Sequence, residues 1–289
     1  MIVKRIKNRD TFKFFNYKWK KVPEWASKTE KIYVNWYLQR YKYKTIANLK
    51  KFLSNKKDIL EAGCGVARDS KLFARLNPKA NVYGCDQSLN AIKKAKKDLS
   101  KFKNVTIFHQ DITKKIKLDK KFDFISCDQV LHHTPYPGKT LKNLFLSLKK
   151  GGHLNFFVCR KKNDYRDYVD DLVMMHFRGK SPKDLWNFAI EVTKFAKSLH
   201  DLKIENLKFK NKKYKNLQLY VHNNIFRAWY DPKIKFDLSV SSNYDWFSNN
   251  PRFKLDELKK IVKNNLKNFR YISTHEDDAS ISISIQKTK

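Results

Sequence analysis

Short, largely apolar runs, most of which end in a polar or acidic residue, alternate with longer, helix-like stretches through the middle of the chain. The runs occupy residues 57–61, 81–86, 105–111, 122–128 and 153–158, and two more occupy 269–273 and 279–285. Helix-like stretches follow, for example up to Leu76 and over 255–266. Regular alternation of strand and helix is the pattern of an α/β protein with a largely parallel sheet. The pattern therefore predicts an α/β fold with seven strands.

The first predicted strand leads through a glycine turn into a helix. Glu61 ends the strand, and Gly63 and Gly65 form the turn. Glycine has no Cβ, so the backbone can turn sharply and let a ligand approach closely. A dinucleotide fingerprint needs a third glycine three residues after the second, and Arg68 holds that position. The pattern therefore disfavours a dinucleotide oxidoreductase, and the acid before the turn suits a positively charged ligand without a pyrophosphate.

Acidic residues also end the second and third predicted strands, as Asp86 and Asp111. Such residues are common turn formers. In open α/β sheets, however, ligands bind at the carboxyl ends of the strands. We therefore interpret Glu61, Asp86 and Asp111 as ligand contacts, and a carboxylate at Asp86 can accept hydrogen bonds from both ribose hydroxyls.

These motifs, in this order, resemble those of class I S-adenosylmethionine-dependent methyltransferases of the small-molecule, type 11 kind. The resemblance covers residues 55–160 well and the C-terminal strands loosely, and it includes segment 128–134 after the fourth strand. Ala67 stands where the family usually has a third glycine, a mild departure. The resemblance implies a Rossmann-like, doubly wound, seven-stranded sheet whose last strand is antiparallel and lies beside the fifth. It also implies S-adenosylmethionine as cofactor and S-adenosylhomocysteine as product.

The resemblance further implies which residues bind the cofactor, with Asp111 near the adenine amino group. The expected set is Glu61, Gly63, Cys64, Gly65, Asp86, Gln87, Asp111, Ile112, Asp128, Tyr17 and Trp19.

Two adjacent histidines, His132 and His133, follow the fourth predicted strand. Histidine titrates near neutrality and can serve as a general base, although a pair in this position can equally be packing. We take both as candidate catalytic residues, with His132 slightly preferred. Transfer of an activated methyl group needs mainly alignment, so the lack of an obvious nucleophile does not argue against an enzyme.

Aromatic residues and lysines interleave over residues 11–25, before the predicted core. Such a segment could stack on nucleic-acid bases or close over a cofactor. We favour the lid, with Tyr17 and Trp19 as its contacts, because similar enzymes carry aromatics here. Residues 27–30 then predict a capping box, and the following helix would bury a face that includes Trp36 and Tyr37.

A long insertion, about residues 161–250, separates the fifth strand from the C-terminal strands. Ser181 followed by Pro182 predicts a helix start, and apolar residues at helical spacing continue to Leu199. Residues 208–213 read as a solvated loop, and 243–248 as an aromatic connection before the last helix. Candidates to line an acceptor site are Tyr165, Met174, Met175, His176, Arg178 and Trp229.

The chain should thus divide into four parts. These are an N-terminal lid and helix (1–54), a cofactor-binding core (55–160), a helical cap (161–250), and a C-terminal helix and strands that complete the core (251–289).

The net charge is +35, from 63 lysines and arginines against 28 acids. Such a charge suggests nucleic acid, an anionic surface or an acidic substrate. Only 11 of the cations are arginine, the residue whose fork matches phosphates and bases best. The lysines spread along the whole chain, which favours compositional drift over a dedicated nucleic-acid surface. Weak, salt-sensitive RNA binding is still expected.

The four cysteines form no C-x-x-C pair, so we expect no metal site. They read as small, reduced side chains at strand ends. The sequence shows no signal peptide and no apolar run long enough for a membrane span. We therefore expect a cytoplasmic protein, of undetermined oligomeric state.

The function predicted from the sequence is in-line methyl transfer from S-adenosylmethionine to a small acceptor, whether a metabolite, a sugar or a lipid-linked molecule. The alternatives are an RNA methyltransferase that uses the basic surface and a basic RNA-binding protein with a vestigial cofactor site. The intact Glu61, Gly63, Gly65, Asp86 and Asp111 argue against the second alternative.

Overall fold

The computed structural model describes residues 8–203, 229–248 and 251–289. The chain divides into two compact units. One contains residues 5–161 and 251–289, and the other contains the helices within 162–250. Each unit is described by itself below.

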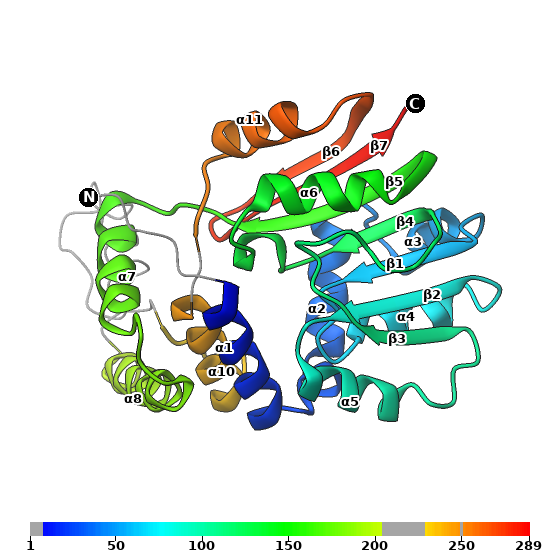
Figure 1. Cartoon of the computed structure of the whole chain (residues 1–289). Coiled ribbons are helices and arrows are strands. Elements are labelled where there is room, and N and C mark those ends of the chain that lie inside the picture. The colour runs from blue at the N-terminus through cyan, green and yellow to red at the C-terminus, as the bar shows by residue number, and fades with distance from the viewer. Residues whose placement is uncertain (1–7, 204–228, 249–250) are drawn as a thin grey trace. The chain divides into compact units, whose positions relative to one another are not determined.

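The larger unit, residues 5–161 with 251–289, is built on one seven-stranded sheet (Figure 1). The strand order is β3-β2-β1-β4-β5-β7-β6, with β7 antiparallel to both β5 and β6 and the other pairs parallel. This confirms the predicted doubly wound sheet and its antiparallel last strand beside β5. The strands are β1 (Asp58–Ala62), β2 (Asn81–Asp86), β3 (Val105–His109), β4 (Phe122–Cys127), β5 (Leu148–Cys159), β6 (Phe269–Glu276) and β7 (Ser280–Lys287).

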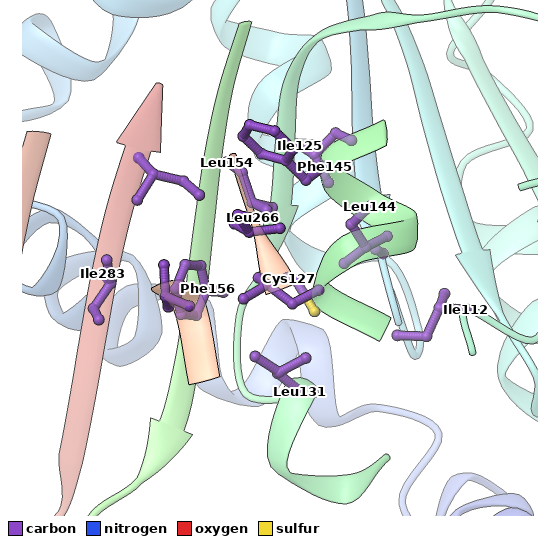
Figure 2. Close-up of a cluster of buried hydrophobic side chains, with 14 of the residues drawn as sticks. Ile112, Ile125, Cys127, Leu131, Leu144, Phe145, Leu154, Phe156, Leu266 and Ile283 are labelled. Carbon is purple, nitrogen blue, oxygen red and sulfur yellow. The ribbon is translucent and has the colours of Figure 1, made fainter. Parts of the chain in front are cut away.

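Helices cover both faces of this sheet, because its central strands are apolar on both sides. In β1, Ile59 joins the core under α2, α3 and α4, whereas Leu60 joins the core under α6 and α11. Figure 2 shows part of the second core, where Cys127, Leu144 and Phe156 converge from β4, α6 and β5. The helices of this unit are α1 (Asn8–Lys21), α2 (Trp25–Arg40), α3 (Ile46–Leu53), α4 (Arg68–Leu76), α5 (Leu89–Asp98), the 3-10 turn η1 (Leu131–His133), α6 (Pro137–Leu146) and α11 (Leu255–Asn265).

The expected start of the second helix was wrong. α2 begins at Trp25, and the hydroxyl of Ser27 donates to the carbonyl oxygen of Glu24 instead of capping the helix. The expected buried face was wrong in part: α2 buries Tyr37 and Leu38, and Tyr41 follows it into the core, while Trp36 stays 39% exposed. A hydroxyl within a helix can satisfy an upstream carbonyl, which the local sequence alone does not distinguish from capping.

The smaller unit contains α7 (Asp164–His176), α8 (Pro182–Asp201) and α10 (Phe236–Phe247). The predicted start of α8 is confirmed, since Ser181 and Asp184 form a reciprocal capping box. Residues 243–248 were expected in a connection, but most of them lie in α10, where the Asn243 amide donates to Thr193 Oγ1 of α8 over 2.8 Å. The predicted loop at 208–213 lies outside the described residues.

Candidate active site

The glycine turn after β1 leaves no room for a side chain at either of its two glycines. Gly63 and Gly65 have φ angles of +78° and +53°, which favour glycine. A Cβ at Gly63 would lie 2.4 Å from Val130, and one at Gly65 would lie 2.6 Å from the indole of Trp19. The turn is therefore a bare backbone cradle covered by a lid residue. Ala67, at the family's third glycine position, also has a positive φ of 61°.

Glu61 lies beneath this turn and fixes the start of the following helix. Its carboxylate accepts hydrogen bonds from the backbone N–H and the hydroxyl of Ser70 in α4. Burial, followed by the charge of Asp69, raises the pKa of Glu61 to about 8. The buried Glu61 thus holds the first turn of α4, the helix that follows the glycine turn.

Asp86 joins the end of β2 to the glycine turn. Its Oδ2 accepts a hydrogen bond of 2.9 Å from the N–H of Gly65, and its Oδ1 accepts one of 2.7 Å from the N–H of Ser88. Burial raises the pKa of Asp86, although these two N–H groups partly offset the effect. The next residue, Gln87, contributes its carbonyl oxygen, which lies 3.0 Å from Nε2 of His109. Glycine turn and strand-end carboxylate therefore meet, a contact that the sequence analysis did not predict.

Asp111 and Ile112 follow β3 at the same edge of the sheet. The Oδ1 of Asp111 accepts hydrogen bonds from the N–H and the hydroxyl of Thr113, at 2.9 and 2.7 Å. Ile112 packs its side chain into the core beside β4. Asp111 thus closes a local turn, and the side chain of Ile112 is part of the core.

Asp128, which follows β4, lies in a buried ionic network. Its carboxylate accepts a hydrogen bond of 2.9 Å from the Tyr41 hydroxyl and lies 3.4 and 3.8 Å from the guanidinium groups of Arg40 and Arg68. Arg68 also pairs with Asp69 at 2.7 Å. The protein's own cations and hydroxyl thus hold this carboxylate.

The two arginines of this network carry aromatic partners. The guanidinium of Arg68 lies 4.4 Å from the ring centre of Tyr33, and that of Arg40 lies 4.7 Å from Phe157. Sequence reasoning noted Arg68 only as a departure from a dinucleotide motif and missed Arg40. Their partners are far away in sequence, so no local pattern indicated the network.

His132 and His133 differ in their surroundings. His132 is buried, with Nε2 3.6 Å from the Cys159 Sγ, and burial lowers its pKa to about 3. His133 is half-buried, and its ring centre lies 4.6 Å from that of Phe15 in α1. A base is most effective when its pKa lies near the working pH. Burial therefore argues against His132, the slightly preferred candidate, as a proton acceptor.

Helix α1 provides the predicted aromatic segment and lies on the glycine turn through Trp19. Asn16 anchors it, since its carbonyl oxygen accepts from the Asn90 amide at 2.9 Å and its side chain accepts from Ser88 at 3.0 Å. Tyr17, the other expected lid contact, lies 5.6 Å from the ammonium of Lys21. The anchoring role of Asn16 was not predicted, because a lone asparagine in a helix carries no such signal.

One further lid residue, Lys18, is buried among aromatic rings. Its Nζ lies 4.6 Å from the ring centre of Trp19, 4.7 Å from Trp25 and 5.8 Å from Phe15. Cation–π contacts of this kind are strongest when the cation is desolvated. They stabilise the lid in the position that covers Gly65.

The remaining expectations concern cysteines and membrane spans. All four cysteines are free and buried, as predicted, and Cys64 lies in the glycine turn itself. Across residues 8–203, 229–248 and 251–289, no helix combines the length and the apolar character that crossing a bilayer requires.

Comparison with known families places this site. Residues 53–181 match the family model described as a methyltransferase domain. Ubiquinone biosynthesis O-methyltransferase of Coxiella burnetii is 35% identical over 149 residues, which cover 49% of this chain and 62% of that protein. The corresponding protein of Shewanella pealeana is 25% identical over 168 residues, 52% of this chain and 67% of that protein. The chain thus matches less than two thirds of the Coxiella relative.

A solved structure agrees with the fold. PKMT2 from Rickettsia typhi in complex with AdoHcy superposes with a TM-score of 0.55 at 17% identity, over 82% of this chain and 49% of that one. At this identity the likeness concerns the fold alone. The glycine cradle, the strand-end carboxylate of Asp86 and the aromatic lid fit a nucleoside cofactor that carries a sulfonium. Residues 53–181 are therefore a methyltransferase domain.

Proposed function

We propose that the whole chain transfers a methyl group from S-adenosylmethionine to a hydroxyl oxygen of a small-molecule acceptor. The observation that carries the proposal is the cradle at Gly63 and Gly65, closed by the Asp86 carboxylate and covered by Trp19. The choice of oxygen is supported by the O-methyltransferases of Coxiella and Shewanella that the domain resembles.

In this proposal the cofactor supplies a methyl group that its sulfonium already activates. The protein then has to bind, orient and exclude water. The Asp86 carboxylate holds the ribose, and the backbone at Gly63 and Gly65 permits close approach. Trp19 shields the turn from water.

A hydroxyl acceptor must lose its proton, and His133 is the candidate to receive it. Its ring is half-buried and lies beside the lid residue Phe15. The ring of His132 packs against that of His133, with the ring centres 4.0 Å apart. Since burial keeps the pKa of His132 low, His132 is neutral at physiological pH and adds no competing charge.

Acceptor choice is proposed to depend on the helical unit within 162–250. The methyltransferase-domain match ends at residue 181, so most of this unit is what the present chain adds to the shared domain. Trp229, which lies beyond the match, is the first position to test for acceptor preference, whereas Tyr165, Met174 and Met175 of α7 lie within it.

The test uses S-adenosylmethionine labelled in its methyl group, with purified protein and an extract of the native cell. The extract is then separated into RNA, lipid and small-molecule fractions. Methyl label in the small-molecule or lipid fraction supports the proposal. Label that survives treatment with base is not in a methyl ester, so it excludes a carboxylate as the acceptor. Label in nuclease-sensitive RNA would contradict the proposal and indicate an RNA methyltransferase. His133→Gln should lower the rate and leave cofactor affinity unchanged.

A further inference from the structure

The edge of the sheet that lies away from the glycine turn is rich in cations. This amino edge, where β1 to β6 begin and β7 ends, lies along the right side of the sheet in Figure 1, with the C-terminus at its upper end. It comprises residues 55–58, 78–81, 101–104, 119–123, 148–151, 267–270 and 286–289. Its cations are Lys56, Lys57, Lys79, Lys101, Lys103, Lys120, Lys121, Lys149, Lys150, Lys267, Arg270, Lys287 and Lys289, and its acids are Asp58, Asp119 and Asp123.

The opposite edge has the reverse balance. In the strand ends and following loops of the larger unit, this carboxyl edge has the cations Arg68, Lys114, Lys115, Arg160 and Lys161 and the acids Asp69, Asp86, Asp111, Asp128, Glu276, Asp277 and Asp278. Arg40 of α2 and the lysines of α1 also reach this edge. Compositional drift toward lysine would act on both edges alike. The difference between two edges of one sheet therefore needs another explanation.

Two of the acids at the amino edge are already engaged. The ammonium of Lys149 lies 3.0 Å from Asp58 and 2.9 Å from Asp123, and that of Lys120 lies 3.3 Å from Asp58. These pairs pin the starts of β1, β4 and β5 together. The other lysines of the edge outnumber the one remaining acid, Asp119, and most of them are exposed.

Some of these cations are close enough to repel one another. Burial, followed by the charges of Lys56 and Arg270, lowers the pKa of His153 in β5 to about 4. Burial and the charge of Lys121 lower the pKa of Lys287. The fold thus concentrates like charges, and a bound polyanion would relieve this repulsion.

We propose that the amino edge is a docking surface for the phosphate backbone of a nucleic acid. Six inter-strand spacings span roughly 30 Å, enough for several phosphates along the edge. Lysine acts as a point charge and contacts phosphates without reading bases. The aromatic residues of these segments, Phe102, Phe122 and Phe269, are buried or half-buried, so they offer no exposed stacking platform. Binding is therefore independent of sequence.

A membrane surface fits this edge less well. Stable attachment to a bilayer needs apolar insertion or a lipid anchor besides charge. The exposed large apolar side chain that this edge offers for insertion is Leu146, at the end of α6. Docking here would leave the glycine turn, at the other end of the strands, free to bind cofactor.

The test measures binding of a fluorescent 20-nucleotide poly(U) RNA by anisotropy over a range of salt concentrations. The edge variant replaces Lys57, Lys103, Lys150 and Lys267 by glutamine, and all four are exposed. A control variant replaces Lys31, Lys93, Lys142 and Lys260, which are exposed on α2, α5, α6 and α11, and removes the same charge. Melting temperature and circular dichroism establish that both variants are folded.

The edge variant should weaken RNA binding at least about tenfold and flatten the slope of log K against log salt by roughly three. The control should change the slope by less than one. Equal loss in both variants, or no measurable RNA binding, would overturn the proposal, as would edge-dependent binding to phosphatidylserine vesicles without binding to RNA. None of these outcomes depends on methyl transfer, so the proposed function can fail or hold independently.

Discussion

The two edges of the sheet use charge in opposite ways. At the carboxyl edge, Asp128 is enclosed by Arg40, Arg68 and Tyr41, and Asp86 closes the glycine turn. At the amino edge, lysines outnumber acids and face solvent. Buried charges require partners in fixed positions, whereas solvated charges do not. The carboxyl edge is thus a pre-organised site, and the amino edge is an electrostatic surface.

The largest expected effect comes from filling the cradle. Gly65→Ala places a methyl group 2.6 Å from the Trp19 indole at a φ of +53°, so the lid or the turn must shift. We expect loss of S-adenosylmethionine binding by about a hundredfold or more, equivalent to roughly 3 kcal/mol. Isothermal titration calorimetry measures the dissociation constant of S-adenosylmethionine in both proteins.

Gly151→Ala, at the amino edge, is the matched control for Gly65→Ala. Gly151 has a φ of +79° with no atom within 4 Å of an added Cβ. It should cost only the backbone strain, about 1 kcal/mol of stability, and leave cofactor affinity unchanged. Equal effects on cofactor affinity in the two variants would show that the cradle is not special.

The second effect concerns stability. Asp128→Ala leaves the buried Arg40 without its carboxylate, and breaking a buried pair costs about 3–5 kcal/mol. Asp123→Ala removes a partly exposed partner of Lys149 and the acceptor of the N–H groups of Lys57 and Asp58, and should cost about 1–2 kcal/mol. Urea unfolding compares the two. A larger loss for Asp123→Ala would reverse the distinction between the edges.

A third effect depends on pH. The pKa of Glu61 is about 8 in the folded protein and 4.5 as the ordinary value. Between these values the folded state retains a proton that the unfolded state has lost, so stability falls as pH rises, by at most about 1.4 kcal/mol per unit. Glu61→Gln should flatten the unfolding free energy over this window. A curve with the same slope in the variant would contradict the assignment.

The smallest expected effect is a difference in how salt changes the pKa values of His132 and His153. Burial alone lowers the pKa of His132, whereas Lys56 and Arg270 add to burial at His153. Salt screens partly exposed charges, so 1 M NaCl should raise the pKa of His153 by a few tenths of a unit and leave His132 unchanged. Imidazole NMR titrations measure both. Equal shifts would mean that the cations of the amino edge are not coupled to His153.

Local patterns were enough to predict the strands, the glycine turn and the position of Asp86 at a strand end. Strands buried on both faces are apolar throughout, and ligands bind open α/β sheets at the carboxyl ends of the strands. The same reasoning predicted the capping of α8 by Ser181.

Contacts between distant segments could not be predicted in this way. Asp128 read as a cofactor contact, yet Arg40 and Tyr41, far upstream, hold its carboxylate. The lid anchor Asn16 and the cage around Lys18 depend likewise on where α1 lies. The basic edge was invisible because its lysines lie in separate loops that only the sheet brings together.

The most direct test of the central claim is calorimetric binding of S-adenosylmethionine to Asp86→Ala, with Asp119→Ala at the amino edge as the control. Asp86 holds the N–H of Gly65 and is the proposed ribose contact, so its loss should weaken binding well over tenfold while Asp119→Ala binds normally. Unchanged affinity in Asp86→Ala would contradict the assignment of the cofactor to this edge of the sheet.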